Sequence, residues 1–110
     1  MDYEEKQRLA ASEDTAIEIL EELATDKNWI VRCSIARNPN ISIKILEQLA
    51  NDEHPWIRSW IAKNHRTPLK TLELLAIDKE SVVRECIIEN PNRTELIERL
   101  VLMTNYQSAK

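Results

Sequence analysis

The most regular polar side chains in this sequence are three arginines spaced one fixed interval apart. Each arginine follows the one before it by 26 residues, and an aspartate stands six residues ahead of each. Guanidinium groups in such a row could hold a phosphate backbone or an acidic peptide. They could also pack along a stack of repeated helices and bond turn carbonyls or the aspartates. Because the aspartates recur in step with the arginines, we interpret both sets as structural ladders, and likewise three recurring asparagines. The ladder residues are Arg32, Arg58 and Arg84, Asp26, Asp52 and Asp78, and Asn38, Asn64 and Asn90.

Tryptophans next to basic residues form the second candidate group. Trp60 stands where the neighbouring repeats have Ser34 and Cys86, so we expect so large a side chain to be half covered. Trp29 falls at a position that we expect to face outward, whereas Trp56 is predicted to lie in the core. Tryptophan and arginine are enriched at binding hot spots, and tryptophan can also stack on single-stranded bases. The candidate partner-binding surface comprises Trp29, Arg37, Trp60, Lys63 and Arg66.

Other chemistry finds little support in the sequence. The chain contains no glycine, which excludes phosphate-cradling loops, dinucleotide fingerprints and the nucleophile elbow. His54 and His65 have no cysteine or acidic partner at metal-ligand spacing. Cys33 and Cys86 stand far apart and indicate reduced thiols, with nothing to mark Cys33 as a nucleophile. We therefore predict no catalytic, cofactor or metal site, and no enzymatic activity.

The elements that must position these side chains are repeated helices. The segment from Leu20 to Asp26 recurs at 46–52 and 72–78, always 26 residues on. Such self-similarity is the signature of a repeat architecture. We predict an all-α fold, a short α-solenoid in one domain over 1–110, with degenerate end units whose outer faces are polar. The expected repeats are 15–40, 41–66 and 67–92, with an N-terminal cap at 3–12 and a C-terminal cap at 93–105.

Each repeat is expected to contain two short helices. The first helices are predicted at 15–25, 41–51 and 67–77, and the second at 28–37, 54–63 and 80–89. Positions 17, 20, 23 and 24 form one helical face, so we expect them and their equivalents to be buried. Thr15 with Glu18 is typical of a capping box, and Thr67 before Pro68 is typical of a helix start. Asn-Pro pairs at 38–39 and 90–91 close two repeats.

The repeated motif resembles the leucine-rich repeat variant (LRV) family, an α-solenoid of bacteria and archaea. The residues that carry the resemblance are Leu23-Ala24-x-Asp26, Trp29-x-Val31-Arg32 and Ala36-x-Asn38-Pro39, with their copies over 13–90. The stretch from aspartate to Val-Arg is also similar to HEAT repeats, whose units are longer. The resemblance implies a curved stack of helix pairs. Some members carry a cysteine-rich iron–sulfur segment, but Cys33 and Cys86 cannot supply four thiolate ligands. The resemblance therefore implies a fold and no activity.

The charge and the hydropathy of the chain bear on which classes of function it could have. The net charge is −4, but residues 31–70 carry seven bases against three acids. No apolar run reaches the ~18 residues of a membrane span, and the polar N-terminus is unlike a signal peptide. We expect a cytoplasmic protein-binding scaffold without a membrane partner. The alternatives are a nucleic-acid-binding module that uses the central basic, Trp-containing segment, and a purely structural or self-associating subunit.

Overall fold

The computed structural model describes residues 1–109, and within that range the ordered elements are eight α-helices without a strand. This confirms the all-helical class predicted from the repeat. The last helix continues to Ala109, past the expected end of the C-terminal cap. The helices are α1 (Tyr3–Ala11), α2 (Ile17–Leu23), α3 (Trp29–Arg37), α4 (Ile43–Leu49), α5 (Pro55–Lys63), α6 (Leu69–Ala76), α7 (Ser81–Ile88) and α8 (Glu95–Ala109).

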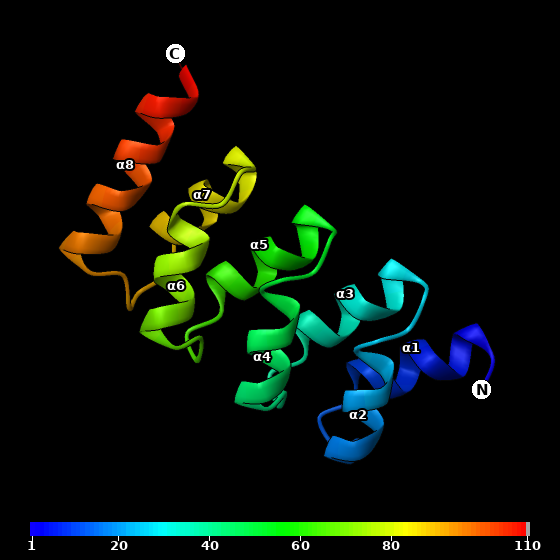
Figure 1. The fold of residues 1–110 in the computed structure, drawn as a ribbon. Coiled ribbons are helices and arrows are strands. Elements are labelled where there is room, and N and C mark those ends of the chain that lie inside the picture. The colour runs from blue at the N-terminus through cyan, green and yellow to red at the C-terminus, as the bar shows by residue number, and fades with distance from the viewer. Residues whose placement is uncertain (110) are drawn as a thin grey trace.

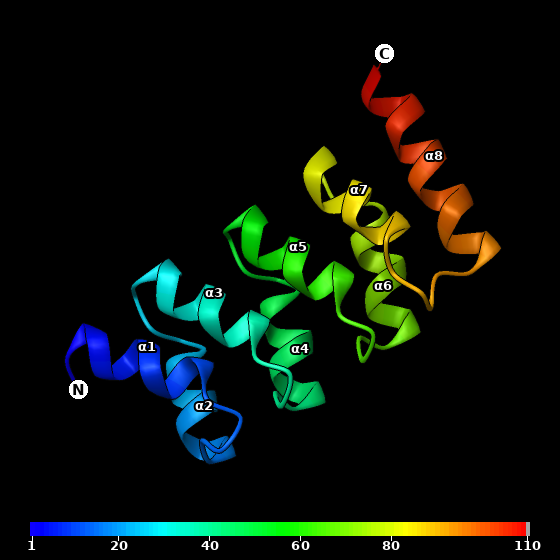
Figure 2. The same ribbon diagram turned by 180° about the vertical axis from the view of Figure 1, so that it is seen from behind.

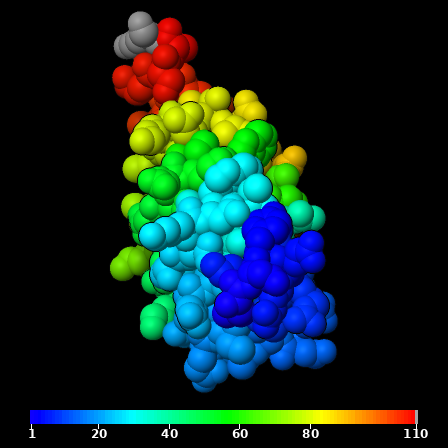
Figure 3. All heavy atoms as spheres, turned by 90° about the vertical axis from the view of Figure 1, so that its right-hand side faces the viewer, coloured from blue at the N-terminus to red at the C-terminus, as the bar shows by residue number. Residues whose placement is uncertain are grey.

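The helices follow one another along an elongated molecule that measures 46 × 24 × 17 Å (Figure 1). One row contains α1, α3, α5 and α7, each in contact with the next, and the second row contains α2, α4 and α6. The reverse view shows the same order, with α8 packed against α6 and α7 at the far end (Figure 2). Seen from the N-terminal end, α1 lies in front and the later helices rise behind it (Figure 3).

A single cluster of buried apolar side chains joins the two rows. Leu20, Leu46 and Leu72, which occupy equivalent positions one repeat apart, are all completely buried in it. Burial of aliphatic side chains on this scale is the main favourable term in folding. Each repeat therefore completes its core on its neighbours. The second-helix contributions to this cluster are Val31, Ile35, Ala36, Ile57, Ile61, Ala62, Val83, Cys86 and Ile87.

Two predictions of burial are wrong. The first position of the predicted apolar face, occupied by Ile17, Ile43 and Leu69, is 41–50% exposed. These residues begin their helices, at the edge of the second row, so the core-facing side chains start further along. Trp56 is 55% exposed and does not belong to the core. It is the second residue of α5, one position before the first buried residue of that helix.

The prediction that Thr15 and Thr67 cap the helices after them is also wrong. Neither α2 nor α6 has a side-chain cap, and their N-cap positions are Ala16 and Pro68. The Thr15 hydroxyl instead donates to the carbonyl of Leu9 at 2.6 Å. Thr67 makes the equivalent bond at 2.7 Å to a carbonyl near the end of α5. These threonines thus satisfy the end of the preceding helix, where unpaired carbonyls are common.

Candidate interaction surface

The arginines and aspartates form one continuous chain of hydrogen bonds, here called the arginine–aspartate ladder. Arg58 Nε donates to Asp78 Oδ2 at 2.8 Å, and its Nη1 donates to the carbonyl of Asp52 at 2.7 Å. Arg32 repeats this pattern one repeat earlier, with Asp52 Oδ2 at 2.8 Å and the Asp26 carbonyl at 2.8 Å. Arg32 and Arg58 therefore each bond the backbone of their own repeat and the carboxylate of the next.

Different side chains end the ladder. At the N-terminal end, Lys6 of α1 pairs with Asp26 at 2.6 Å. This bond is the main reason that the pKa of Asp26 is lowered, with a further contribution from the backbone N–H of Asn28. At the C-terminal end, Arg84 Nε donates to Asn105 Oδ1 of α8 at 2.7 Å. The helices α1 and α8 thus satisfy the outermost polar groups of the repeats.

The ladder arginines are committed to the protein itself. The side chains of Arg32 and Arg58 are only 11% and 7% exposed, and Arg84 is buried. Their donors already point at carboxylates, an amide oxygen or turn carbonyls, so a ligand would have to displace these partners. A buried pair separated in this way leaves an uncompensated charge. These arginines therefore hold the repeats together and are not free to bind a ligand.

Two of the three recurring asparagines also connect neighbouring repeats. Asn38 Nδ2 donates to the carbonyls of Ala10 and Ser12, at 2.8 and 2.9 Å. Asn90 makes the equivalent pair of bonds to carbonyls at the end of α5, at 2.8 and 3.0 Å. Within residues 1–109, no such bond joins Asn64 to the end of α3. The Asn64 side chain accepts the backbone N–H two residues on, as the other two asparagines do.

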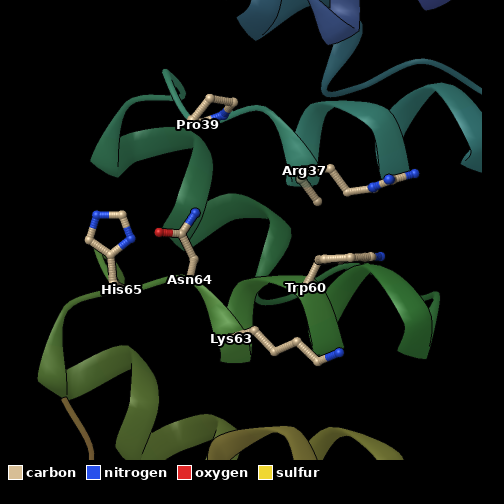
Figure 4. Close-up of a pocket in the computed structure, with 7 residues that line it drawn as sticks. Arg37, Pro39, Trp60, Lys63, Asn64 and His65 are labelled. Atoms are coloured by element: carbon tan, nitrogen blue, oxygen red, sulfur yellow. The ribbon is translucent and has the colours of Figure 1, made fainter. Parts of the chain in front are cut away.

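Three members of the candidate surface lie together at the contact between α3 and α5. The Cζ atom of Arg37 lies 5.0 Å from the centre of the Trp60 ring, and Nζ of Lys63 lies 5.1 Å from it. Figure 4 shows the indole between the two basic side chains, with all three extending in the same direction. Cations over an indole face are stabilised by its quadrupole. Arg37, Trp60 and Lys63 are called the Trp60 stack below.

The other two candidate residues lie elsewhere. Trp29 is the first residue of α3, about 12 Å along the helix from Arg37. Its ring stacks on the imidazole of His54, with centroids 4.1 Å apart. Arg66, in the loop after α5, donates from Nη1 to the carbonyls of Pro39 and Ile41. The structure therefore separates the five predicted residues into the Trp60 stack, a Trp29–His54 pair and a loop arginine that bonds backbone.

A pocket of about 210 Å³ lies beside the Trp60 stack. Asn64, His65 and Pro39 line its opposite side (Figure 4). None of these three was assigned to the binding surface from the sequence, and Asn64 was interpreted as structural. A usable signal was the tryptophan itself, because a large residue at a position held elsewhere by serine and cysteine alters the space around it. The residues lining the pocket are Ala36, Arg37, Pro39, Trp60, Lys63, Asn64 and His65.

Both cysteines lie near the Trp60 stack but are poorly suited to chemistry. Burial raises the pKa of Cys33, and the nearby Arg37 offsets this only in part. Burial likewise raises the pKa of Cys86, against a smaller opposite effect of Lys63. Thiols with raised pKa values are mostly protonated at neutral pH and react slowly. The arrangement at this surface therefore supports binding by charge and aromatic contact.

Comparisons with known proteins do not indicate a function for this chain. No family model, no curated protein and no solved structure matches the chain. Residues 1–109 hold no helix with the length and apolar character needed to cross a bilayer. The same residues contain no group of three or more histidines, cysteines or carboxylates placed to hold a metal ion.

Proposed function

We propose that the chain is a non-enzymatic α-solenoid of the leucine-rich repeat variant type that binds another protein in the cytoplasm. The binding surface is the Trp60 stack and the pocket beside it. The observation that carries this proposal is that Arg37 and Lys63 are exposed cations placed against an aromatic face. Tryptophan and arginine are enriched among the residues that contribute most binding energy near the centres of protein interfaces.

Most of the other recurring polar side chains already bond within the protein, which supports this choice of surface. The ladder arginines and two of the three recurring asparagines already have internal partners. Among the carboxylates of residues 1–109, none forms an ion pair with Arg37, and Lys63 has only Glu89 at 3.5 Å, an exposed pair. Exposed pairs contribute little stability and are exchanged readily. Arg37 and Lys63 are therefore cations that an incoming partner can use without breaking a buried pair.

Comparative affinity purification tests the proposal. The wild-type chain and a Trp60→Ala, Lys63→Ala variant are used as baits, and the recovered proteins are quantified by mass spectrometry. Trp56→Ala is the matched control, because it removes an exposed tryptophan from the same helix away from the pocket. We expect at least one partner to be reduced about tenfold or more with the Trp60 variant and retained with the control. Recovery of every partner by both variants would contradict the proposal.

The two alternative functions predict different results. A nucleic-acid-binding module requires binding of a single-stranded oligonucleotide that weakens steeply with salt, since phosphate contacts release counterions. A self-associating subunit requires a sedimentation coefficient that rises with protein concentration. Circular dichroism melting of each variant confirms that it is folded before any loss of binding is interpreted.

A further inference from the structure

A strip of exposed charges crosses the three helices α3, α5 and α7. Arg37 is the last residue of α3, Lys63 is the last residue of α5, and Glu89 directly follows α7. The three stand at equivalent positions one repeat apart, and each is exposed. Since α5 contacts both α3 and α7 in the first row (Figure 1), the strip runs across the helices. Its charge changes from positive at α3 to negative at α7.

Contacts between neighbouring side chains join these charges into one surface. Arg37 Cζ and Lys63 Nζ lie 5.0 and 5.1 Å from the centre of the Trp60 ring, and Lys63 Nζ lies 3.5 Å from Glu89 Oε2. Because these contacts follow one another, the guanidinium and the Glu89 carboxylate are no more than about 14 Å apart. A single short segment of another protein can therefore reach both ends.

Two carboxylates make up the negative end. Glu85 stands one turn before Glu89 on α7 and is exposed. Burial is the main cause of the raised pKa of Cys86, but Glu85 and Glu89 also raise it and Lys63 lowers it. These three charged groups therefore lie near the same thiol. Arg37, Lys63, Glu85 and Glu89 are called the charged strip below.

Arg37 is held in place but keeps its hydrogen-bond donors. Figure 4 shows its charged end extending along the indole of Trp60, in the same direction as Lys63 and away from Asn64. The contact with the indole is electrostatic, and within residues 1–109 no acceptor bonds the guanidinium. Its donors therefore remain available to a carboxylate, which can accept two of them at once. A side chain that is ordered beforehand also loses less conformational entropy on binding.

The negative end can bind a cation of a partner. Within residues 1–109, Glu85 forms no ion pair, and Glu89 has only the exposed contact with Lys63. Exposed pairs of this kind contribute little stability. An incoming ammonium or guanidinium group can therefore pair with these carboxylates without breaking a buried interaction.

The shape of the charged strip suits an extended segment. A docked helix lays an apolar face into an apolar groove, whereas this strip is charged at both ends and has a single indole between its cations. In an extended chain, alternate side chains lie on one face and about 7 Å apart, so that charges four residues apart are separated by about 13 Å. This spacing matches the distance between the two ends of the strip.

We infer that the charged strip binds an extended segment of the partner protein in which an acidic and a basic residue stand four residues apart. The acidic side chain pairs with Arg37, and the basic side chain pairs with Glu85 and Glu89. Lys63 lies between the two ends and favours a neutral or acidic residue in the middle of the segment. This inference rests on the proposed protein-binding function and specifies the chemistry of the partner.

The change of sign along the strip favours a peptide over a nucleic acid. A phosphate backbone carries negative charge at every nucleotide and is bound by rows of basic residues. Glu85 and Glu89 would repel such a backbone at α7. A peptide can instead place a carboxylate at α3 and a basic side chain at α7.

Binding of short peptides to the full chain tests the inference. The first peptide is an acetylated, amidated chain of alternating serine and threonine that carries one glutamate and one lysine four residues apart. In the other three peptides the two charged residues are adjacent, or glutamine replaces either the glutamate or the lysine. The indole N–H signal of Trp60, assigned through a Trp60→Phe variant, reports binding by NMR at low salt.

The spacing of the charges decides the result. We expect the first peptide to shift the Trp60 signal saturably and the other three to bind about fivefold more weakly. A first peptide that gives no saturable shift would overturn the inference. So would a peptide with adjacent charges that binds as tightly as the first.

Charge reversal shows which group of the protein meets which charge of the peptide. Arg37→Glu should weaken the first peptide about tenfold and should strengthen binding of a peptide with lysine in place of the glutamate. Arg99→Glu, which reverses an exposed arginine on α8, is the control and should change neither affinity. Equal effects of the two variants would overturn the inference.

Two further measurements examine other occupants of the strip. A single-stranded oligothymidylate that binds at least as tightly as the first peptide would overturn the inference in favour of a nucleic acid. A dimer in sedimentation experiments that Arg37→Glu dissociates would overturn it in favour of a second copy of the chain.

The outcomes separate this inference from the proposed function. A partner that depends on Trp60 in affinity purification, together with no binding of the first peptide, leaves the protein-binding function standing and overturns the role of the charged strip. Binding of the first peptide that Arg37→Glu weakens, without any Trp60-dependent partner, supports the charged strip and contradicts the proposed function in the cell extract used.

Discussion

Arg58 makes several hydrogen bonds that hold one repeat to the next. It is buried, it binds both oxygens of Asp78 at 2.8 and 3.1 Å, and it also binds the Asp52 carbonyl. Asp78 in turn accepts the backbone N–H of Glu80 at 2.9 Å. The guanidinium fork is suited to this role because it presents several donors in a fixed plane, which a lysine ammonium cannot do.

Replacing Arg58 by lysine should therefore be destabilising although the charge is kept. We expect Arg58→Lys to lower the free energy of unfolding by about 2–3 kcal/mol, because the largely covered carboxylate of Asp78 and the carbonyl of Asp52 lose donors from a buried side chain. Urea denaturation followed by circular dichroism measures this change. The control is Arg99→Lys at an exposed pair on α8, which should change stability by less than about 0.5 kcal/mol. Similar losses for both variants would show that the ladder contributes no special stability.

The Lys6–Asp26 pair predicts how stability responds to acid. The pKa of Asp26 is lowered in the folded chain, below an ordinary value of about 4. The charged carboxylate therefore stabilises the fold above pH ~4, and this contribution is lost as the pH falls through the folded pKa. We expect Asp26→Asn to melt at a lower temperature than wild type at pH 7. The difference should shrink as the pH is lowered towards 2, and a difference independent of pH would contradict this.

The second helices of the repeats share one plan of packing, so a change at one junction can be compared with its equivalents. Ser34, Trp60 and Cys86 stand at the same position of α3, α5 and α7. The small residues accompany asparagines that bond across the junction, and the tryptophan accompanies one that does not. This is a natural comparison of three sites within one chain.

The comparison predicts that Trp60→Ser changes the contact between α3 and α5. With a side chain like Ser34 in place, Asn64 should reach the carbonyls at the end of α3. We expect its side-chain amide protons to exchange with solvent about tenfold more slowly than in wild type. Side-chain amide signals in NMR measure this exchange, with Trp56→Ser as control. An Asn64 amide that exchanges unchanged in a folded Trp60→Ser variant would show that Trp60 does not keep Asn64 from the end of α3.

The sequence predicted the helical elements well because their signal is periodic. Leu20, Leu46 and Leu72 recur at the repeat spacing, and burial follows from that recurrence. The predictions of individual caps and buried positions failed where the environment of a side chain depends on a neighbouring element. Thr15 bonds the end of α1 and does not cap α2, and Trp56 lies too near the start of α5 to be covered. The pocket escaped prediction because its lining comes from two helices and the loops after them, and the periodic pattern does not report how these side chains meet.

At the scale of the whole molecule, the two end helices differ from the repeats in what they offer the next unit. Helix α1 supplies Lys6 and α8 supplies Asn105, where an inner repeat would supply an arginine and an aspartate. Helix α8 also covers the core with Ile97 and Val101. A stack of this kind is stable only if its last units cover the faces that its inner units leave open.

Asn105 should contribute more to the stability of the fold than other polar residues of α8. We expect Asn105→Ala to lower the free energy of unfolding by about 1–2 kcal/mol, because the buried Arg84 loses an acceptor. Gln107→Ala, an equally exposed position on the same helix, is the control and should be nearly neutral. Thermal or urea unfolding measures both. Equal stability of the two variants would show that Arg84 does not depend on α8.

The end helices limit where further repeats could be added to this protein. A new 26-residue unit added after Ala109 would meet Asn105 in place of a matching carboxylate and Ile97 already turned inward. The same unit inserted between Asn64 and Thr67 would find an arginine before it and an aspartate after it. Duplication of an inner repeat would therefore keep the ladder continuous, whereas a unit placed beyond Asn105 would have to replace the bond from Arg84 to Asn105.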